Sequence, residues 1–262
     1  MRLAVPSRPA ATSGPASISD ELQVLAALHE IGADLGDPVE VKLSEGRVVV
    51  GGVGIPRERQ EQIRGKLNAL PKVTVQFSDP APGTSVPAES AAPAATAGAP
   101  STAFQARLEQ QLGGQAEFEK FSAQVLDRNE SLMSRAYALR RLAENFPADA
   151  DMAAKDREVL RALARQHASA LSTDLARLDR ALKPVLVSLG GSALSGQAAA
   201  ATSWQPAAEE LARASHRLEV LVSVLLGVTP ANASTDRLPS DLLLALSEVR
   251  ADLDGCLHLL AQ

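Results

Sequence analysis

Apolar residues in the C-terminal part of the chain recur at seven-residue intervals in four separate segments. A repeat of this length is typical of helices that pack against one another along an apolar seam. Stretches rich in Gly, Pro and Ser separate the repeats, and short connections return each helix antiparallel to the one before it. Residues 103–262 are therefore predicted to form an antiparallel four-helix bundle in up-down order. The repeats consist of Phe118, Val125, Leu132, Leu139 and Phe146; Leu171, Leu178 and Val185; Trp204, Leu211, Leu218 and Leu225; and Leu242, Val249 and Cys256.

A different pattern occupies residues 18–77. Leucines at helical spacing precede Gly36, and Ser19 is placed to cap that helix. The stretches "VEVKL" and "RVVVGG" flank the turn "SEG" and predict a hairpin of two strands. A second helix is expected after Pro56, and "KVTVQF" is expected to add a third strand. These residues predict a small α-β-β-α-β domain.

Residues 78–102 contain many prolines and almost no large apolar side chain. Such a segment cannot bury enough surface to offset the entropy lost on ordering, so we expect a flexible linker. Residues 1–17 are expected to form a disordered N-terminal segment. The chain is thus predicted to be α+β, with a domain at 18–77, a linker at 78–102 and a helical bundle at 103–262.

Composition narrows the classes of function. Apolar residues make up 45% of the chain and aromatic residues only 3%, so the cores must be aliphatic. A net charge of -5 argues against a nucleic-acid partner, because nucleic-acid surfaces need clustered cations. The longest apolar run is interrupted by charge and is far shorter than the roughly 18 to 20 residues that cross a bilayer. We therefore expect no membrane span within this chain.

The stretch "VVVGGVGIP", residues 48–56, raises the question of a phosphate-binding glycine loop. A dinucleotide fingerprint requires a third glycine where this chain has Arg57. Pro56 also removes an N–H group from the helix end that would receive the pyrophosphate. We interpret the glycines as a bend at a strand end, and a nucleotide-binding enzyme is kept only as the weakest alternative.

The remaining candidates for chemistry have structural interpretations. Cys256, the only cysteine, falls in an apolar seam, where a buried side chain is expected rather than a reactive thiol. The four histidines, at 29, 167, 216 and 258, lie on separate predicted helices without a partner at ligand spacing. The sequence therefore predicts no catalytic residue, no cofactor and no metal site.

Arg128 and Arg135 fall between the apolar positions of the first repeat. A cation in a seam is unfavourable unless it pairs with an acid or reaches water along its stem. One hypothesis is that both arginines lie at the seam edge, and the other is that they set helix register or bind a partner. The expected counter-ions are nearby acids in the sequence: Asp127, Glu130 and Glu144.

Residues 20–77 resemble a BON domain, a small module of bacterial envelope proteins. Val50 stands where that family has leucine, and Gly54 is an additional glycine. The resemblance implies attachment to envelope surfaces or partners rather than catalysis. It is carried by Val39-Glu40-Val41, by residues 45–52, by Glu58-Arg59 and Ile63, and by Val73-Thr74-Val75.

The helical part is similar to the extracytoplasmic part of uncharacterised bacterial anti-sigma-factor-like membrane proteins, through "RNESLMSRAYALRRLAENFP" and "DREVLRALARQHASAL" together with "LQVLAALHEIGADLGDPVEV" upstream. In such proteins a zinc-finger segment and a membrane helix precede this part. The resemblance implies a non-enzymatic interaction or sensor region that binds a protein or envelope component on the periplasmic side, if the chain is a fragment of an anchored protein. The alternatives are a cytoplasmic protein and a structural, oligomerising coiled coil, and the oligomeric state stays open.

Overall fold

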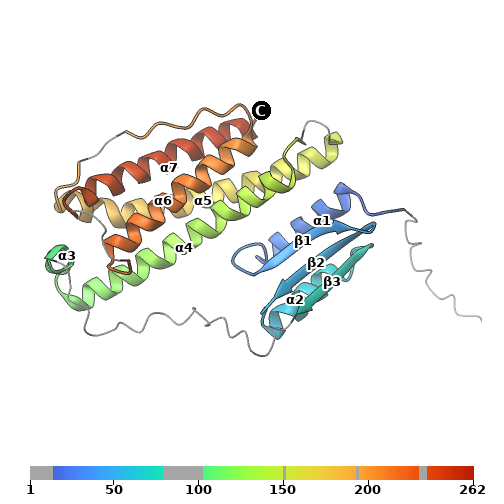
Figure 1. Cartoon of the computed structure of the whole chain (residues 1–262), viewed down its shortest axis with the longest axis horizontal. Helices are drawn as coiled ribbons and strands as arrows, with labels where there is room; N and C mark the ends of the chain where they lie inside the picture. Colours follow the sequence, from blue (N-terminus) through green and yellow to red (C-terminus); the bar gives the residue numbers. More distant parts are fainter. Residues whose placement is uncertain (1–13, 79–102, 150–151, 193–194, 230–234) are drawn as a thin grey trace, which may run out of the picture. The chain divides into compact units, whose positions relative to one another are not determined.

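The computed structural model describes residues 14–78, 103–149, 152–192, 195–229 and 235–262 (Figure 1). The protein is α+β, as the sequence predicts. It divides into two compact units, Met1–Ala91 and Ala92–Gln262. Residues 1–13 and 79–102 lie outside the described residues, so the predicted disordered segment and linker stay predictions there. Residues 14–17 are described and attached to the first unit, since the N–H of Ala16 donates to the carbonyl of Gly46 at 2.7 Å and Ser17 caps α1.

The first unit contains a sheet of three strands in the order β1-β2-β3. β1 and β2 pair antiparallel, whereas β2 and β3 pair parallel. Glu45 and Gly46 form the hairpin turn and both have positive φ, as a two-residue turn between twisted strands requires. The elements are α1 (Ile18–Glu30), β1 (Val39–Ser44), β2 (Arg47–Val53), α2 (Arg57–Leu67) and β3 (Val73–Ser78).

The core of this unit forms on one face of the sheet. Val41, Val50 and Val75 lie in register on neighbouring strands. The helices supply the other side of the core, including the buried Leu28 and Ile63. α1 contacts β1 and β2, and α2 contacts β3. Alternating valines therefore place one apolar face of the sheet under both helices.

The first helix is capped by a residue other than the one predicted. Ser17 is the N-cap, and its hydroxyl and backbone N–H bind Asp20 in a capping box. Ser19 lies within the helix, so the prediction that it caps the helix is wrong. Residue Glu30 ends the helix, before Gly32 and Gly36, which both have positive φ.

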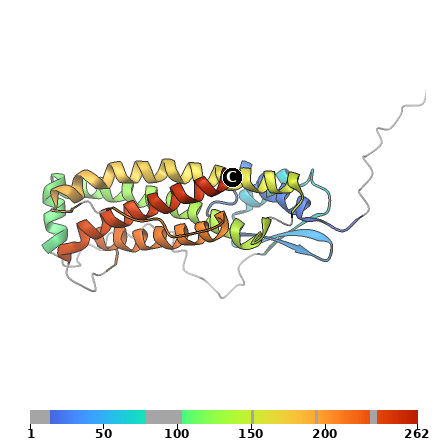
Figure 2. The ribbon, with the colours of Figure 1, turned by 90° about the horizontal axis from the view of Figure 1, so that it is seen from above.

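The second unit consists of helices. Four long helices, α4 to α7, lie side by side in both views (Figures 1 and 2). None of the described helices is long and apolar enough to cross a lipid bilayer. The elements are α3 (Ala103–Leu112), α4 (Gln115–Asn145), α5 (Ala154–Ser188), α6 (Trp204–Leu225), a 3₁₀ turn (Thr235–Arg237) and α7 (Leu238–Leu260).

Side-chain contacts fix the directions of these helices. The end of α4 meets the start of α6, because Gln205 donates to the carbonyl of Phe146 at 3.3 Å. The start of α5 meets the end of α7, because Arg165 donates to the carbonyl of Leu260 at 3.0 Å. α4 packs on α5 and α6, and α7 packs on the same two helices. Each of these packed pairs is antiparallel.

The predicted up-down order is nevertheless wrong. α5 and α6 run in the same direction, and the described residues 189–192 and 195–203 of their connection, here called the crossover, lead from the end of one to the start of the other. The crossover runs along α7, where the N–H groups of Ser192, Gly196 and Ala199 donate to Ser240, Ser247 and Asp252 at 3.1, 2.8 and 2.8 Å. It lies so close to α7 that a Cβ at position 196 would stand 2.4 Å from the Glu248 nitrogen.

On each long helix the buried positions cover a wider stripe than the seven-residue repeat, with one additional position in each repeat, would give. In α4 the buried positions include Asn129 and Ala136, four residues after Val125 and Leu132, and also Met133 directly after Leu132. In α6, Ala208 and Val222 are fully buried in the same way. The structure thus has the broad core-facing stripe of a globular helix, with alanines where the helices approach closely.

Candidate functional site: an arginine-lined groove between α4 and α5

Arg135 forms an ion pair that joins two helices. Its Nε lies 2.6 Å from Oδ2 of Asp174 on α5. Asp174 is only 6% exposed, and its other oxygen accepts a bond from Arg177 at 3.4 Å. The predicted counter-ions on α4 are therefore wrong. Glu144, one of them, pairs with Arg140 instead.

Arg128 also reaches from α4 to α5. Its Nη1 donates to the backbone carbonyl of Arg177 at 3.3 Å. Arg128 and Arg135 are both half-buried, whereas the neighbouring Asn129 and Ala136 occupy the buried seam. The two arginines therefore lie at the seam edge, where the stems pack on protein and the guanidinium groups stay near water. Their role toward a partner stays a prediction.

A groove opens between α4 and α5 beside Arg128. Its lining combines apolar side chains with guanidinium groups and consists of Phe121, Gln124, Arg128, Arg177, Arg180 and Ala181. A neighbouring hollow continues along α5 past Lys183 and Pro184 to Val187. Val187 is 53% exposed, so the apolar character of the surface extends beyond the groove.

The groove has surplus positive charge. Arg180 donates to the carbonyl of Ala176 on its own helix. In the part of the chain that the structure describes, no carboxylate lies within ion-pair distance of Arg128, Arg180 or Lys183. Asp179 borders the hollow, but it pairs with Arg250 on α7 at 3.2 Å.

Asn129 lies in the seam next to the groove. It is 5% exposed, and its Oδ1 has no hydrogen-bond partner among the described residues. A buried asparagine can fix helix register, because only one alignment gives its amide a polar neighbour. The seven-residue repeat does not single out Asn129, although its position four residues after Val125 is a signal of burial.

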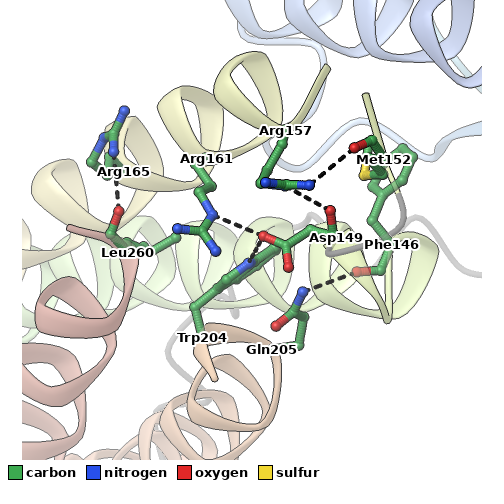
Figure 3. A network of polar contacts seen from close by, with 9 residues as sticks. All are labelled: Phe146, Asp149, Met152, Arg157, Arg161, Arg165, Trp204, Gln205 and Leu260. Atoms are coloured by element: carbon green, nitrogen blue, oxygen red, sulfur yellow. Dashed lines mark hydrogen bonds and ion pairs between the residues drawn. The ribbon is translucent and has the colours of Figure 1, made fainter. Parts of the chain in front are cut away.

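A second polar cluster lies at the opposite end of α4 (Figure 3). Oδ2 of Asp149 accepts bonds from Nε of Arg161 at 2.8 Å and from Nε1 of Trp204 at 3.3 Å. Burial alone would raise the pKa of Asp149, but the hydrogen bonds from Arg161 and Trp204 outweigh it and lower the pKa. The carboxylate thereby joins α5 and α6 to the segment after α4.

The rest of this cluster satisfies backbone carbonyls. Arg157 donates to the carbonyls of Asp149 and Met152 at 2.9 and 3.0 Å. Gln205 and Arg165 bind the carbonyls of Phe146 and Leu260, at the ends of α4 and α7 (Figure 3). Helix ends leave such carbonyls without intrahelical partners. The donors of this cluster are directed to the protein itself, so we regard it as structural.

Cys256, His216 and His29 were candidates for chemistry in the sequence, and they lie in different surroundings. Cys256 is buried, and burial raises the pKa of its thiol to about 12. Nδ1 of His216 lies 2.9 Å from Glu219 on the exposed side of α6. Nδ1 of His29 lies 2.8 Å from Asp34 within the first unit.

The glycines of residues 48–56 serve the packing of the sheet. Gly51 and Gly52 lie inside β2. A Cβ at Gly52 would stand 2.4 Å from the Ile55 side chain and 2.8 Å from the Pro38 carbonyl oxygen. Gly54 turns the chain toward α2 with a φ of 73°. These contacts agree with the interpretation of a strand end rather than a loop open to phosphate.

Comparisons of the chain with family models, with curated proteins and with solved structures give no match.

Proposed function

We propose that the helical unit is a non-enzymatic interaction module that binds an acidic segment of a protein partner in the groove between α4 and α5. The observation that carries the proposal is a set of cations beside apolar Phe121 and Ala181 that have no carboxylate within ion-pair distance among the described residues: Arg128, Arg180 and Lys183. Guanidinium groups bind carboxylates in bidentate fashion, so such a surface favours Asp and Glu side chains.

The shape of the surface favours a helical segment. The positions from Arg177 to Val187 on α5 span roughly 15 Å at 1.5 Å per residue, which corresponds to two or three helical turns of a ligand. A partner helix with one acidic and one apolar stripe could lie along this surface, with its carboxylates on the arginines and its apolar side chains toward Phe121.

The sequence resemblances supply the biological setting of the proposal. The first unit resembles a BON domain, and the helical unit resembles the extracytoplasmic part of anti-sigma-factor-like proteins. We therefore propose that the module is the sensor or interaction region of a bacterial envelope signalling protein. In that setting the partner is a protein at the extracytoplasmic side of the membrane.

The test uses a panel of fluorescent, acidic, amphipathic helical peptides and the full chain in an anisotropy titration. We expect Arg128→Gln combined with Arg180→Gln to weaken binding at least about tenfold, since two charge-assisted contacts are removed. The matched control, Arg213→Gln with Arg217→Gln, removes the same charge from exposed positions of α6 that already pair with acids. It should change binding by less than about twofold.

Two outcomes would overturn the proposal. Equal losses in both double variants would show that the peptides respond to net charge rather than to the groove. Vesicles containing phosphatidylglycerol form the second arm of the experiment. If they bind in a manner that depends on Arg128 and Arg180 while no peptide binds, the surface recognises lipid headgroups and the protein partner is wrong.

A further inference from the structure

The two outer strands of the sheet differ in how their free edges are protected. An edge strand presents unpaired N–H and C=O groups, and proteins usually block it with charges or proline. β1 carries Glu40 and Lys42, which pair at 2.7 Å. β3 has the sequence "VTVQFS", without a charge or a proline, and in the described sheet it pairs with β2 alone.

The hydrogen bonds of the β2–β3 ladder show which groups of β3 are directed outward. The carbonyl of Lys72 accepts a bond from the N–H of Val48 on β2 at 3.0 Å, and the carbonyl of Ser78 accepts one from the N–H of Gly54, directly after β2, at 3.2 Å. In a parallel ladder every second residue bonds to the same neighbour, so Thr74 and Gln76 also face β2. The backbone groups of Val73, Val75 and Phe77 consequently lie on the free edge.

A groove that combines apolar side chains with the polar groups of Arg64 and Asn68 accompanies this edge. It lies between α2 and β3 and is lined by Leu67, Leu70, Val73 and Val75, with Arg64 at one end. The guanidinium of Arg64 lies 5.0 Å from the centre of the Phe77 ring. Apolar side chains and free backbone groups thus run side by side along β3.

We infer that β3 pairs antiparallel with β3 of a second copy of this chain, across a two-fold axis at Val75. The result is one continuous sheet with three strands from each copy. This inference goes beyond the proposed function, because it concerns the first unit and a different partner.

Self-complementarity of the strand specifies both the partner and the register. Centring the pairing on Val75 places Val73 opposite Phe77 of the second copy and Thr74 opposite Gln76. The apolar side chains of both copies then lie on the face that the helices cover. A shift of the pairing by one residue would place those of the second copy on the opposite face. The pairing places the aromatic Phe77 opposite the β-branched Val73, and it places no like charges opposite each other. It also brings Phe77 of the second copy beside Leu70, at the groove.

The test is sedimentation equilibrium of the full chain. The chain should dimerise, and Thr74→Lys combined with Gln76→Lys should raise the dissociation constant about tenfold, because it places two lysine pairs opposite each other. Thr74→Lys combined with Gln76→Glu is the matched variant, because each lysine then faces a glutamate. It should restore dimerisation to within about threefold of the original chain.

Amide hydrogen exchange gives a second readout that depends on the backbone. The amides of Val73, Val75 and Phe77 should become protected as protein concentration rises, whereas those of Thr74 and Gln76 should be protected at every concentration. A chain that remains monomeric up to its solubility limit overturns the inference. A dimer that both double variants leave unchanged also overturns it and places self-association elsewhere. Neither result bears on peptide binding by the helical unit.

Discussion

The indole Nε1 of Trp204 donates a hydrogen bond to Oδ2 of Asp149, over 3.3 Å, and so joins the start of α6 to the segment after α4. The same oxygen accepts from Arg161 of α5 at 2.8 Å. One carboxylate therefore connects parts of the chain that are far apart in sequence. Trp204 is the only tryptophan, so its fluorescence reports on this end of the helical unit.

The lowered pKa of Asp149 predicts a pH dependence of stability. Because the folded state favours the carboxylate, the stabilisation is present above the ordinary carboxyl pKa of about 4 and is lost as pH falls through the lower, folded value. Asp149→Asn should cost about 1–3 kcal/mol at neutral pH. This difference should shrink as pH falls below the lowered pKa of the folded state, where the original carboxyl is protonated as well. Denaturant unfolding followed by Trp204 fluorescence measures both chains, and a difference independent of pH would contradict the assignment.

Because Asp174 forms an ion pair with Arg135, its removal should lower the free energy of unfolding more than the removal of an exposed acid does. Asp174→Ala leaves the half-buried Arg135 without its partner and should destabilise the chain by about 1–3 kcal/mol. Asp127→Ala removes an exposed acid from α4 and should cost less than about 0.5 kcal/mol. Urea unfolding compares the two variants. Equal costs would mean that water replaces Asp174 without loss.

The buried apolar face of α6 predicts that substitutions at two nearby positions have different effects on stability. Leu218 is fully buried, whereas His216 is exposed and pairs with Glu219 on its own helix. Leu218→Ala should cost about 2–5 kcal/mol through lost apolar contact and the cavity left behind. His216→Ala should cost less than about 0.5 kcal/mol. A larger effect at His216, measured by denaturant unfolding, would show that the wrong face of α6 has been assigned to the core.

The strand glycines provide a matched pair of substitutions. Gly52→Ala forces a methyl group against the Pro38 carbonyl and the Ile55 side chain, and should cost about 1–3 kcal/mol. A Cβ at Gly51 meets its nearest neighbour, the Gln76 carbonyl oxygen, at an ordinary 3.6 Å. Gly51→Ala should therefore be neutral or stabilising by up to about 1 kcal/mol. Thermal unfolding distinguishes them, and a destabilised Gly51→Ala would require a different explanation for both glycines.

The sequence of the first unit indicated its elements more readily than their arrangement. Alternating valines and the turn at Glu45-Gly46 mark β1 and β2, because apolar alternation and positive φ are local properties. The parallel addition of β3 to β2 was not predictable in this way. Both edges of a hairpin offer equivalent backbone groups, and the choice depends on where α2 returns the chain. The cap could have been found, since Ser17 has an acid three residues later and Ser19 does not.

In the helical unit the seven-residue spacing identified the helices but not their partners. Arg135 finds its acid 39 residues away on another helix, which no local spacing can indicate. The length of the connection between α5 and α6 also led to the wrong helix order. An extended chain over residues 191–203 spans roughly 40 Å, longer than the roughly 35 Å of α7. A connection of that length can form a hairpin or traverse the whole bundle, so length alone does not decide the helix order.

The crossover is the covalent link between two helical hairpins, α4–α5 and α6–α7. Each hairpin alone would expose the apolar side that the other covers, yet the two are joined through the packing of α4 on α6 and of α5 on α7. A backbone break in the crossover would therefore leave two fragments that complement each other. Their affinity would measure directly how strongly the two halves of this unit hold together.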